Sequence, residues 1–371
     1  MASKELKIAI TGAKGFIGKN LISELKNQGY LNLLKITRDT SVKELKSILT
    51  EAELVFHLAG INRPISDNEF EKGNIDFTRK ILETLVELNN IVPIVVTSST
   101  QAINDNAYGL SKKAAEEVVK IYAKDNNVEC GIYRLPNVFG KWSKPNYNSA
   151  IATFCHNIAR DLPIQVNDPS VELTLVYIDD VVNEFITCLE GMETLYREVP
   201  VVHKKKLGEI VELIYSFKAS RENRSVPKLD DPFEKKLYST YLSFLPEDQF
   251  SYELKMNVDR RGSFTEFIKT VDRGQVSINI SKPGITKGNH WHHTKNEKFL
   301  VVSGNGVIRF RKPNETMIIE YFVCGDKLEV VDIPVGYTHN IENLGESDMV
   351  TVMWVNEPFD PDNPDTYFLE V

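Results

Sequence analysis

Through about the first 245 residues, short apolar runs alternate with stretches of helical period. The runs at 6–12, 53–60 and 93–100 are rich in β-branched and aromatic residues, as buried strands usually are. Segments such as 19–29 and 78–90 repeat apolar residues every three or four positions, which predicts amphipathic helices. Together they predict βαβ units in a doubly wound α/β domain with a parallel sheet.

Beyond Phe250 the chain changes to short strands separated by Gly, Pro and Asn turns. We predict strands at 261–267, 274–281, 298–304, 306–312, 316–323 and 326–333. This pattern favours an all-β barrel or jelly roll. A Pro and Asp cluster followed by a short amphipathic helix joins the two halves at 220–249. The sequence therefore predicts two domains, 1–246 and 247–371.

Composition limits the classes of protein to which the chain can belong. Its 371 residues are 42% hydrophobic and 26% charged, which suffices for two cores and argues against disorder. No apolar run approaches the roughly 20 residues of a membrane-spanning helix, and the start lacks the pattern of a signal peptide. The net charge of −8 opposes binding to nucleic acid. We expect a cytoplasmic protein with no membrane or nucleic-acid partner.

A glycine-rich turn follows the first predicted strand. Gly12, Gly15 and Gly18 stand between that strand and a predicted helix, so that backbone amides can approach a pyrophosphate at the helix N-terminus. Arg38 ends the second predicted strand, where an acidic residue would bind a free ribose 2′-hydroxyl. Its guanidinium suits a 2′-phosphate and indicates NADPH, although the neighbouring Asp39 argues the other way.

Tyr108 and Lys112 stand four residues apart in a predicted helix, after a run of hydroxyl residues that ends at Thr100. Residues at this spacing share a helix face. The ammonium group of Lys112 can therefore lie near the phenol and lower its pKa.

These features occur with further motifs in a fixed order. The motifs are HLAG at 57–60, Asn74, RLPNVFG at 134–140 and YIDDV at 177–181. Together with the glycine turn they resemble the extended branch of the short-chain dehydrogenase/reductase superfamily, which has a Rossmann-type fold. The chain departs from the family in the short gap between Thr100 and Tyr108.

The resemblance implies a reductase or epimerase that acts on a nucleotide sugar. Tyr108 would protonate the carbonyl oxygen, Lys112 would tune it, and Thr100, or alternatively Ser99, would hydrogen-bond the same oxygen. The implied cofactor-binding residues are Gly12, Gly15, Phe16, Ile17, Gly18, Arg38, Leu58, Ala59, Gly60 and Lys112. The candidates for the nucleotide half of the substrate are Asn137, Lys141 and Arg224.

Four potential metal ligands gather in the second half of the chain. His290 and His292 alternate on a predicted strand, Glu297 follows, and His339 comes later beside a Pro and Gly turn. Imidazoles two residues apart project from one side of a strand, so three nitrogens and a carboxylate can converge on a divalent ion. His293 should point to the opposite face.

Residues 284–304 and 325–343 resemble the two conserved motifs of the cupin superfamily. The second motif departs slightly, because its first glycine lies farther from Pro334 than usual. Candidates for a catalytic base in this half are His290, Lys298 and Tyr337, and the sequence does not choose among them.

The two halves constrain the chemistry jointly. A ketone at C4 of a sugar acidifies the hydrogen at C3, so that removal and return of this proton can invert the centre. Hydride reduction of the ketone ends that acidity. If both halves serve one pathway, the cupin must act first.

Over its whole length the chain resembles a family of bifunctional capsular polysaccharide synthesis enzymes. The resemblance implies C3 epimerisation of a UDP-4-keto-6-deoxy-HexNAc, followed by C4 reduction with NADPH to UDP-2-acetamido-2,6-dideoxy-L-talose, on the route to UDP-N-acetyl-L-fucosamine. It also implies a zinc-like ion and a homodimer. Three alternatives remain: a reductase with a non-catalytic cupin, an iron-dependent dioxygenase, and a 4-epimerase with tightly held NAD.

Overall fold

A computed structural model describes residues 3–64, 66, 68–270, 272–362 and 364–371. The chain forms two compact units, of which the first comprises residues up to 215 together with 229–246. The second comprises 216–228 together with 247–371.

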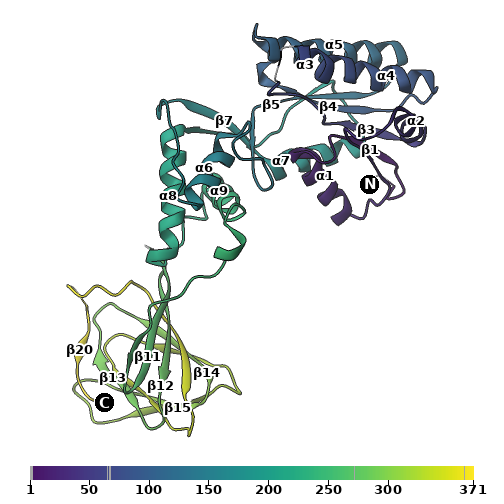
Figure 1. Ribbon diagram of the computed structural model, residues 1–371. Coiled ribbons are helices and arrows are strands. Elements are labelled where there is room, and N and C mark those ends of the chain that lie inside the picture. Colours follow the sequence, from purple (N-terminus) through teal and green to yellow (C-terminus); the bar gives the residue numbers. More distant parts are fainter. Residues whose placement is uncertain (1–2, 65, 67, 271, 363) are drawn as a thin grey trace. The chain divides into compact units, whose positions relative to one another are not determined.

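The first unit is built on a six-stranded parallel sheet with helices on both faces (Figure 1). Its strands, in spatial order, are β2 (Leu33–Ile36), β1 (Ile8–Thr11), β3 (Leu54–His57), β4 (Ile94–Ser99), β5 (Cys130–Leu135) and β8 (Tyr196–Arg197). One face packs on α1 (Phe16–Asn27) and α7 (Ile178–Thr187). The other packs on α2 (Val42–Glu51), α4 (Phe77–Glu87) and α5 (Ala107–Asn126).

The order of residues within each strand explains this layering. In β1, Ile8 and Ile10 enter the core beneath α1, whereas Ala9 enters the core on the opposite face. Successive side chains of a strand point to opposite faces, and every residue of β1 is buried. A continuous apolar run is therefore required here, as for any parallel strand covered on both sides.

The remaining elements of the first unit extend from this sheet. A small sheet is formed by β6 (Asn137–Phe139), β7 (Glu172–Tyr177) and β9 (His203–Lys206). The helices are α3 (Asn68–Phe70), α6 (Ala150–Ala159) and α9 (Pro232–Leu242), with α8 (Leu207–Asn223) running from this unit into the second. Short helical segments are η1 (Glu71–Asp76), η2 (Thr100–Ile103) and η3 (Cys188–Glu190).

The second unit contains two antiparallel sheets, and η4 (Glu247–Gln249) precedes their first strand. One sheet has the order β10 (Asn257–Asp259), β11 (Gly262–Thr270), β12 (Gly274–Ser281), β19 (Met349–Val355), β14 (Glu297–Ser303) and β17 (Val330–Ile333). The other has the order β16 (Ile319–Cys324), β15 (Asn305–Arg311), β18 (Thr338–Asn343), β13 (Thr286–Trp291) and β20 (Tyr367–Phe368).

The space between these sheets is part apolar and part polar. Phe299, Ile308 and Phe310 belong to a buried apolar cluster. On β12, by contrast, every second side chain is polar and buried, namely Gln275, Ser277, Asn279 and Ser281. Burial of so many polar groups on one wall is typical of a binding cavity rather than a core.

The predicted fold class is confirmed. The first unit has the doubly wound parallel sheet, and the second has the all-β architecture expected for a cupin. Among the described helices, none is long and apolar enough to cross a membrane.

Candidate functional site

The glycine turn after β1 brings backbone segments too close together for side chains. A Cβ on Gly18 would lie 2.3 Å from the carbonyl oxygen of Gly12, and one on Gly12 would lie 2.9 Å from the nitrogen of Ala59. Gly12 also has φ +66, which disfavours other residues. α1 begins with Phe16 and Ile17 and has neither a side-chain cap nor an acidic residue in its first turn. Its first amides are therefore suited to an anion.

The HLAG turn is fixed against this glycine turn by Thr11. The Thr11 hydroxyl accepts hydrogen bonds from the backbone nitrogens of Leu58 and Ala59, both at 3.1 Å. The same oxygen lies 2.9 Å from Nδ1 of His57. The ends of β1 and β3 thus form one rigid edge, and Gly60 follows directly.

Arg38 lies in the turn after β2 and is exposed. Within the described ranges, no hydrogen bond or ion pair involves its guanidinium. The neighbouring Asp39 instead forms an ion pair of 2.8 Å with Lys14 of the glycine turn. Lys14 is a residue that the sequence reasoning missed, and its place between Gly12 and Gly15 was the available signal. With Asp39 neutralised, this edge carries a net positive charge.

The structure brings Tyr108 together with Ser99 but not with Thr100. Ser99 is buried at the end of β4, whereas Thr100 is exposed at the start of η2. Burial raises the pKa of Tyr108, and the side chain of Ser99 opposes this shift only in part. The sequence-based expectation that Lys112 lowers the pKa of Tyr108 is therefore not the net effect in this structure.

Lys112 lies one helical turn after Tyr108, on α5. Its ammonium donates to the carbonyl oxygen of Thr97 at 3.1 Å, and a Cβ on Gly60 would lie 3.0 Å from Nζ. Burial lowers the pKa of Lys112 to about 8, although the charge of Glu116 opposes the shift. Tyr108, Lys112 and the glycine-rich edge thus share one end of the sheet, where α/β folds bind their ligands.

The three candidates for the nucleotide half of the substrate have different partners in the structure. Asn137 is exposed at the start of β6 and donates to the carbonyl oxygen of Thr174 at 3.2 Å. Lys141 forms an ion pair with Asp179. Arg224 belongs to the second unit, where it pairs with Glu266 at 2.9 Å.

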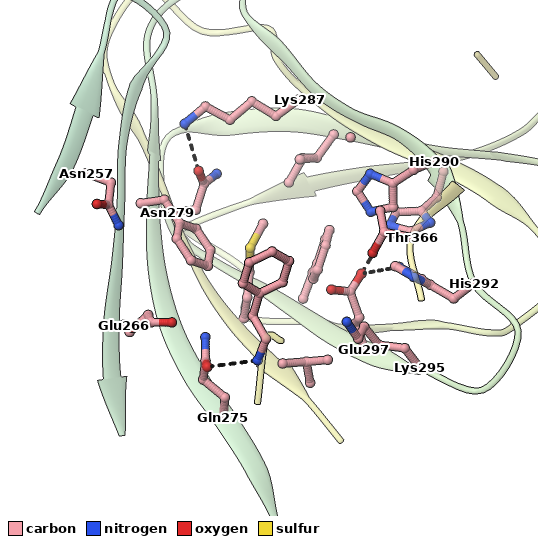
Figure 2. Close-up of a pocket in the computed structure, with 18 of the residues that line it drawn as sticks. Asn257, Glu266, Gln275, Asn279, Lys287, His290, His292, Lys295, Glu297 and Thr366 are labelled. Carbon is pink, nitrogen blue, oxygen red and sulfur yellow. Dashed lines mark hydrogen bonds and ion pairs between the residues drawn. The ribbon is translucent and has the colours of Figure 1, made fainter. Parts of the chain in front are cut away.

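The four expected metal ligands converge in the second unit (Figure 2). One ligand atom from each of His290, His292, Glu297 and His339 lies within 4.8 Å of the others. His290 ends up opposite His339 because the pairing of β13 with β18 shifts by a bulge after Gly288. His292 lies just beyond the end of β13, whereas Glu297 begins β14 in the other sheet.

The donor atoms of this cluster lack hydrogen-bond partners. Oε2 of Glu297 lies 3.1 Å from Nε2 of His339 and 3.6 Å from Nε2 of His292, yet none of these buried atoms has a hydrogen-bond partner among the described residues. Burial opposes ionisation of Glu297, but the two histidines lower its pKa to about 2. Burial lowers the pKa of His290 to about 4. An ionised carboxylate beside imidazole nitrogens that have no hydrogen-bond partner fits a divalent cation.

The cluster opens into a cavity of about 530 Å³. Figure 2 shows Lys287 and Asn279 on the side opposite His290. Of the candidates for a catalytic base, His290 lines the cavity, whereas neither Lys298 nor Tyr337 is among its described lining residues. Lys298 pairs instead with Asp332.

The cavity has a polar wall that the sequence reasoning missed. Its lining side chains include Gln275, Asn279, Lys287 and Lys295. The available signal was the alternation in GQVSINIS at 274–281, in which every second residue is polar. His293 is exposed and packs against Trp291 and Tyr367, away from the cluster, as strand alternation predicts.

Two family models match the chain, one for each half. The NAD dependent epimerase/dehydratase family matches residues 8–198. The polysaccharide biosynthesis C-terminal domain matches residues 257–367.

Similar proteins cover nearly the whole chain. A UDP-2-acetamido-2,6-beta-L-arabino-hexul-4-ose reductase from Pseudomonas aeruginosa is 45% identical over 368 residues, covering 99% of each chain. The crystal structure of the capsular polysaccharide assembling protein CapF from Staphylococcus aureus is 61% identical, with a TM-score of 0.94, and covers 99% of this chain and 100% of CapF. A structure of CapF with the inhibitor 3-isopropenyl-tropolone is 57% identical, with a TM-score of 0.89, and covers 98% and 99% of the two chains.

These matches confirm the resemblance found in the sequence. The shared architecture extends over both units, and the identity is well above the level at which only the fold is shared. The chain belongs to the NAD dependent epimerase/dehydratase family and, within it, to the family of the capsular polysaccharide assembling protein CapF.

Proposed function

We propose that the chain is a bifunctional nucleotide-sugar enzyme of capsular polysaccharide synthesis. The cupin, within residues 247–371, epimerises C3 of a UDP-4-keto-6-deoxy-HexNAc. The reductase, within residues 1–246, then reduces C4 with NADPH to UDP-2-acetamido-2,6-dideoxy-L-talose, on the route to UDP-N-acetyl-L-fucosamine. The observation that carries this proposal is the presence of two chemically different clusters of side chains in one chain, with a relative named as a reductase of a UDP-linked hexul-4-ose.

The reductase step uses the residues at the end of the parallel sheet. NADPH, held at the glycine-rich edge, would supply hydride to C4, and the Tyr108 hydroxyl would donate its proton to the carbonyl oxygen. We assign the second hydroxyl to Ser99 in place of Thr100, because Ser99 is buried and lowers the pKa of Tyr108, whereas Thr100 is exposed. The buried ammonium of Lys112 favours the phenolate that forms as the proton leaves.

NADPH rather than NADH fits the charge beside β2. Arg38 is unpaired within the described residues, and Lys14 neutralises Asp39. The implied cofactor-binding set, Gly12, Gly15, Phe16, Ile17, Gly18, Arg38, Leu58, Ala59, Gly60 and Lys112, lies along this edge of the sheet. Asn137 and Lys141 remain our candidates for the nucleotide half of the substrate, whereas the pairing of Arg224 with Glu266 favours a structural role.

The epimerase step needs a cavity that holds a 4-ketosugar and stabilises an enolate. His290, His292, Glu297 and His339 would hold a zinc ion, which supplies Lewis acidity at the ketone oxygen. Removal of the C3 proton puts its electron pair into the C3–C4 bond and the negative charge on the oxygen. Return of a proton from the other face inverts C3. Because His290 would bind the ion through its free lone pair, it cannot also take this proton, and we assign the base to another group of the cavity wall.

A homodimer formed through the cupin agrees with its surface. Tyr321 and Phe322 of the edge strand β16 are 51% and 68% exposed, and Leu328 and Val330 nearby in the chain are 64% and 59% exposed. We take these exposed side chains as the candidate contact between two copies of the chain. Sedimentation equilibrium tests this, and a mass of one 42.2 kDa chain would contradict it.

The function is tested by exchange in heavy water. The UDP-4-ketosugar is incubated with the full-length protein in deuterium oxide, without NADPH, and C3 is examined by NMR. We expect deuterium at C3, and none with protein stripped of metal. If C3 keeps its hydrogen while added NADPH is oxidised, the protein is a reductase with a non-catalytic cupin.

A further inference from the structure

The segment 364–371 lies against the strands that carry the metal ligands. Its strand β20 pairs antiparallel with β13, where Phe368 is opposite His290. The backbone nitrogen of Leu369 donates to the carbonyl oxygen of Asn289 at 3.0 Å, and its carbonyl oxygen accepts from the hydroxyl of Thr338. The segment therefore joins the strand of His290 to the strand of His339.

Within this segment, the carboxylate of Asp365 holds the turn that follows His292. One carboxylate oxygen accepts from the backbone nitrogen of His293 at 3.0 Å. The other accepts from the nitrogen and hydroxyl of Thr294 at 2.9 and 3.1 Å, and from the nitrogen of Lys295 at 3.0 Å. Although burial raises it, these bonds bring the pKa of Asp365 well below its usual range. The carboxylate is thus a fixed anchor for three successive backbone amides.

The backbone of the same residue orients the ring of His292. Nδ1 of His292 lies 2.6 Å from the carbonyl oxygen of Asp365. A carbonyl oxygen only accepts, so Nδ1 must carry the proton. In the neutral ring, Nε2 then has a free lone pair, and it lies 3.6 Å from Oε2 of Glu297. This is the ring form and direction that a metal ligand needs.

The other fully buried histidine of the cluster lacks such a contact. His339 is 1% exposed, and its Nδ1 has no hydrogen-bond partner in the part of the chain that the structure describes. His292 is therefore held by a dedicated partner 73 residues away in the sequence. A residue that orients a ligand from outside the coordination sphere typically changes metal affinity about 10–100-fold when it is removed.

We propose that Asp365 is a positioning residue of the metal centre and acts through His292. Its carbonyl oxygen selects the ring form that binds metal through Nε2, and its carboxylate fixes the turn that presents the ring. This inference rests on the metal site of the proposed function, but not on the epimerase activity itself.

The test is metal binding by full-length protein in which Asp365 is replaced. We expect Asp365→Ala to bind Zn²⁺ about 10–100-fold more weakly, as measured by competition with a chromophoric chelator. The visible spectrum of the Co²⁺-loaded protein should change, because the turn that carries His292 loses its carboxylate anchor, while the backbone carbonyl oxygen of residue 365 is retained. Asp365→Asn retains one acceptor oxygen in its side chain, so its affinity for Zn²⁺ should fall less than that of Asp365→Ala. The matched control is Asp362→Ala, which removes an exposed carboxylate three residues before Asp365 and should bind as wild type does.

A double-mutant cycle shows whether the effect passes through His292. In a His292→Ala background, Asp365→Ala should weaken Zn²⁺ binding by less than twofold. Equal losses in both backgrounds, or wild-type affinity and an unchanged Co²⁺ spectrum in Asp365→Ala, would overturn the proposal even if the variant melts earlier. Because no sugar is used, failure of the C3 exchange in wild-type protein would remove the epimerase proposal and leave this result standing.

Discussion

The two units each bury a histidine at the end of a strand, and they do so for opposite reasons. His57 of the first unit is 2% exposed, and its ring nitrogens lie 2.9 Å from the hydroxyls of Thr11 and Thr78. His339 of the second unit is 1% exposed, and neither ring nitrogen has a hydrogen-bond partner among the described residues. Burial alone does not separate the two residues. The hydrogen bonding of the ring nitrogens separates them. A neutral ring whose two nitrogens both have partners is fully hydrogen-bonded, whereas a ring without partners beside a carboxylate is suited to binding a cation.

The same contrast extends to the sites around them. In the first unit, Tyr108 and Lys112 occupy successive turns of one helix, and three glycines lie within seven residues. In the second unit, ligands come from two sheets, and the partner of His292 is 73 residues away. Local spacing builds the first site, whereas tertiary packing builds the second. The two sites should therefore fail independently.

The largest effect that tests this independence is expected for Tyr108→Phe. Loss of a general acid costs about 10²–10⁴-fold in rate, so NADPH oxidation with the ketosugar should fall by that factor. Deuterium exchange at C3 should proceed as in wild type. Stopped assays of both reactions on one preparation supply the comparison, and a parallel loss of exchange would mean that the two sites are not separate.

Glu297→Gln should produce the reciprocal result. It removes the one negative charge of the donor set, so Zn²⁺ affinity should fall by more than the roughly 10–100-fold typical of an outer-shell partner. C3 exchange should disappear with the metal, while NADPH oxidation by a substrate already epimerised should continue. Metal content by atomic spectroscopy is the first measurement. A full complement of bound zinc would show that the carboxylate is not a ligand.

The sequence predicted residues better than it predicted their partners. Four candidate ligands were predicted, His290 and His292 from alternation in a strand and Glu297 and His339 from their places later in the sequence. The structure brings these four side chains together. The contact of Asp365 with His292 has no local pattern, because it depends on where a distant segment packs. The pairing of Asp39 with Lys14 was missed for the same reason.

The choice between two adjacent hydroxyl residues shows how finely the sequence could predict the site. Ser99 and Thr100 are adjacent, and the sequence reasoning favoured Thr100 with Ser99 as the alternative. β4 ends at Ser99 and η2 begins at Thr100, so that one side chain faces Tyr108 and the other is exposed. If the end of β4 shifts by one residue, the other hydroxyl becomes the better candidate. Sequence patterns do not predict the ends of strands to within one residue.

A smaller effect, on cofactor affinity, is expected when the positive charge of Arg38 beside β2 is removed. Arg38→Ala should weaken NADPH about 10–100-fold, because a hydrogen bond to a charged group contributes about 1.5–3 kcal/mol, and should leave NADH nearly unchanged. Lys14→Ala should weaken NADPH and strengthen NADH, since it frees the carboxylate of Asp39. Fluorescence titration gives both affinities, and Lys43→Ala, at an exposed position on α2, is the control. Equal weakening of both cofactors by Arg38→Ala would remove the 2′-phosphate assignment.

The smallest effect concerns the ring form of His57. The Thr78 hydroxyl donates to the carbonyl oxygen of Asn74 at 2.6 Å, so it must accept from Nε2 of His57. Nδ1 then accepts from Thr11, whose oxygen in turn receives backbone amides. A neutral His57 thus satisfies both hydrogen bonds of its ring. If Nδ1 were also protonated, it and the hydroxyl of Thr11 would both be donors, and this hydrogen bond would be lost.

The stability of the first unit should depend on this neutrality. Burial, with the charge of Lys112 adding to it, lowers the pKa of His57 from 6.5 to about 3. As pH falls below 6.5 the unfolded chain takes up a proton that the folded ring does not. The free energy of unfolding therefore decreases from pH 6.5 towards pH 3, by at most about 1.4 kcal/mol per pH unit for one proton.

His57→Gln retains a donor and an acceptor but does not titrate. We expect this variant to be less stable than wild type at pH 7, because the amide fills the site less well, and to lose less stability between pH 6.5 and 4.5. Calorimetric unfolding across this range measures how the free energy of unfolding changes with pH. Carboxylates titrate in both proteins, so their contribution cancels when the variant is compared with wild type. His290 has a lowered pKa as well, but the zinc ion that we propose would exclude its proton only while the metal stays bound. Adding a chelator should therefore change the pH dependence of the second unit and leave that of the first as it was, whereas the same change in both would show that the two kinds of buried histidine are not distinct.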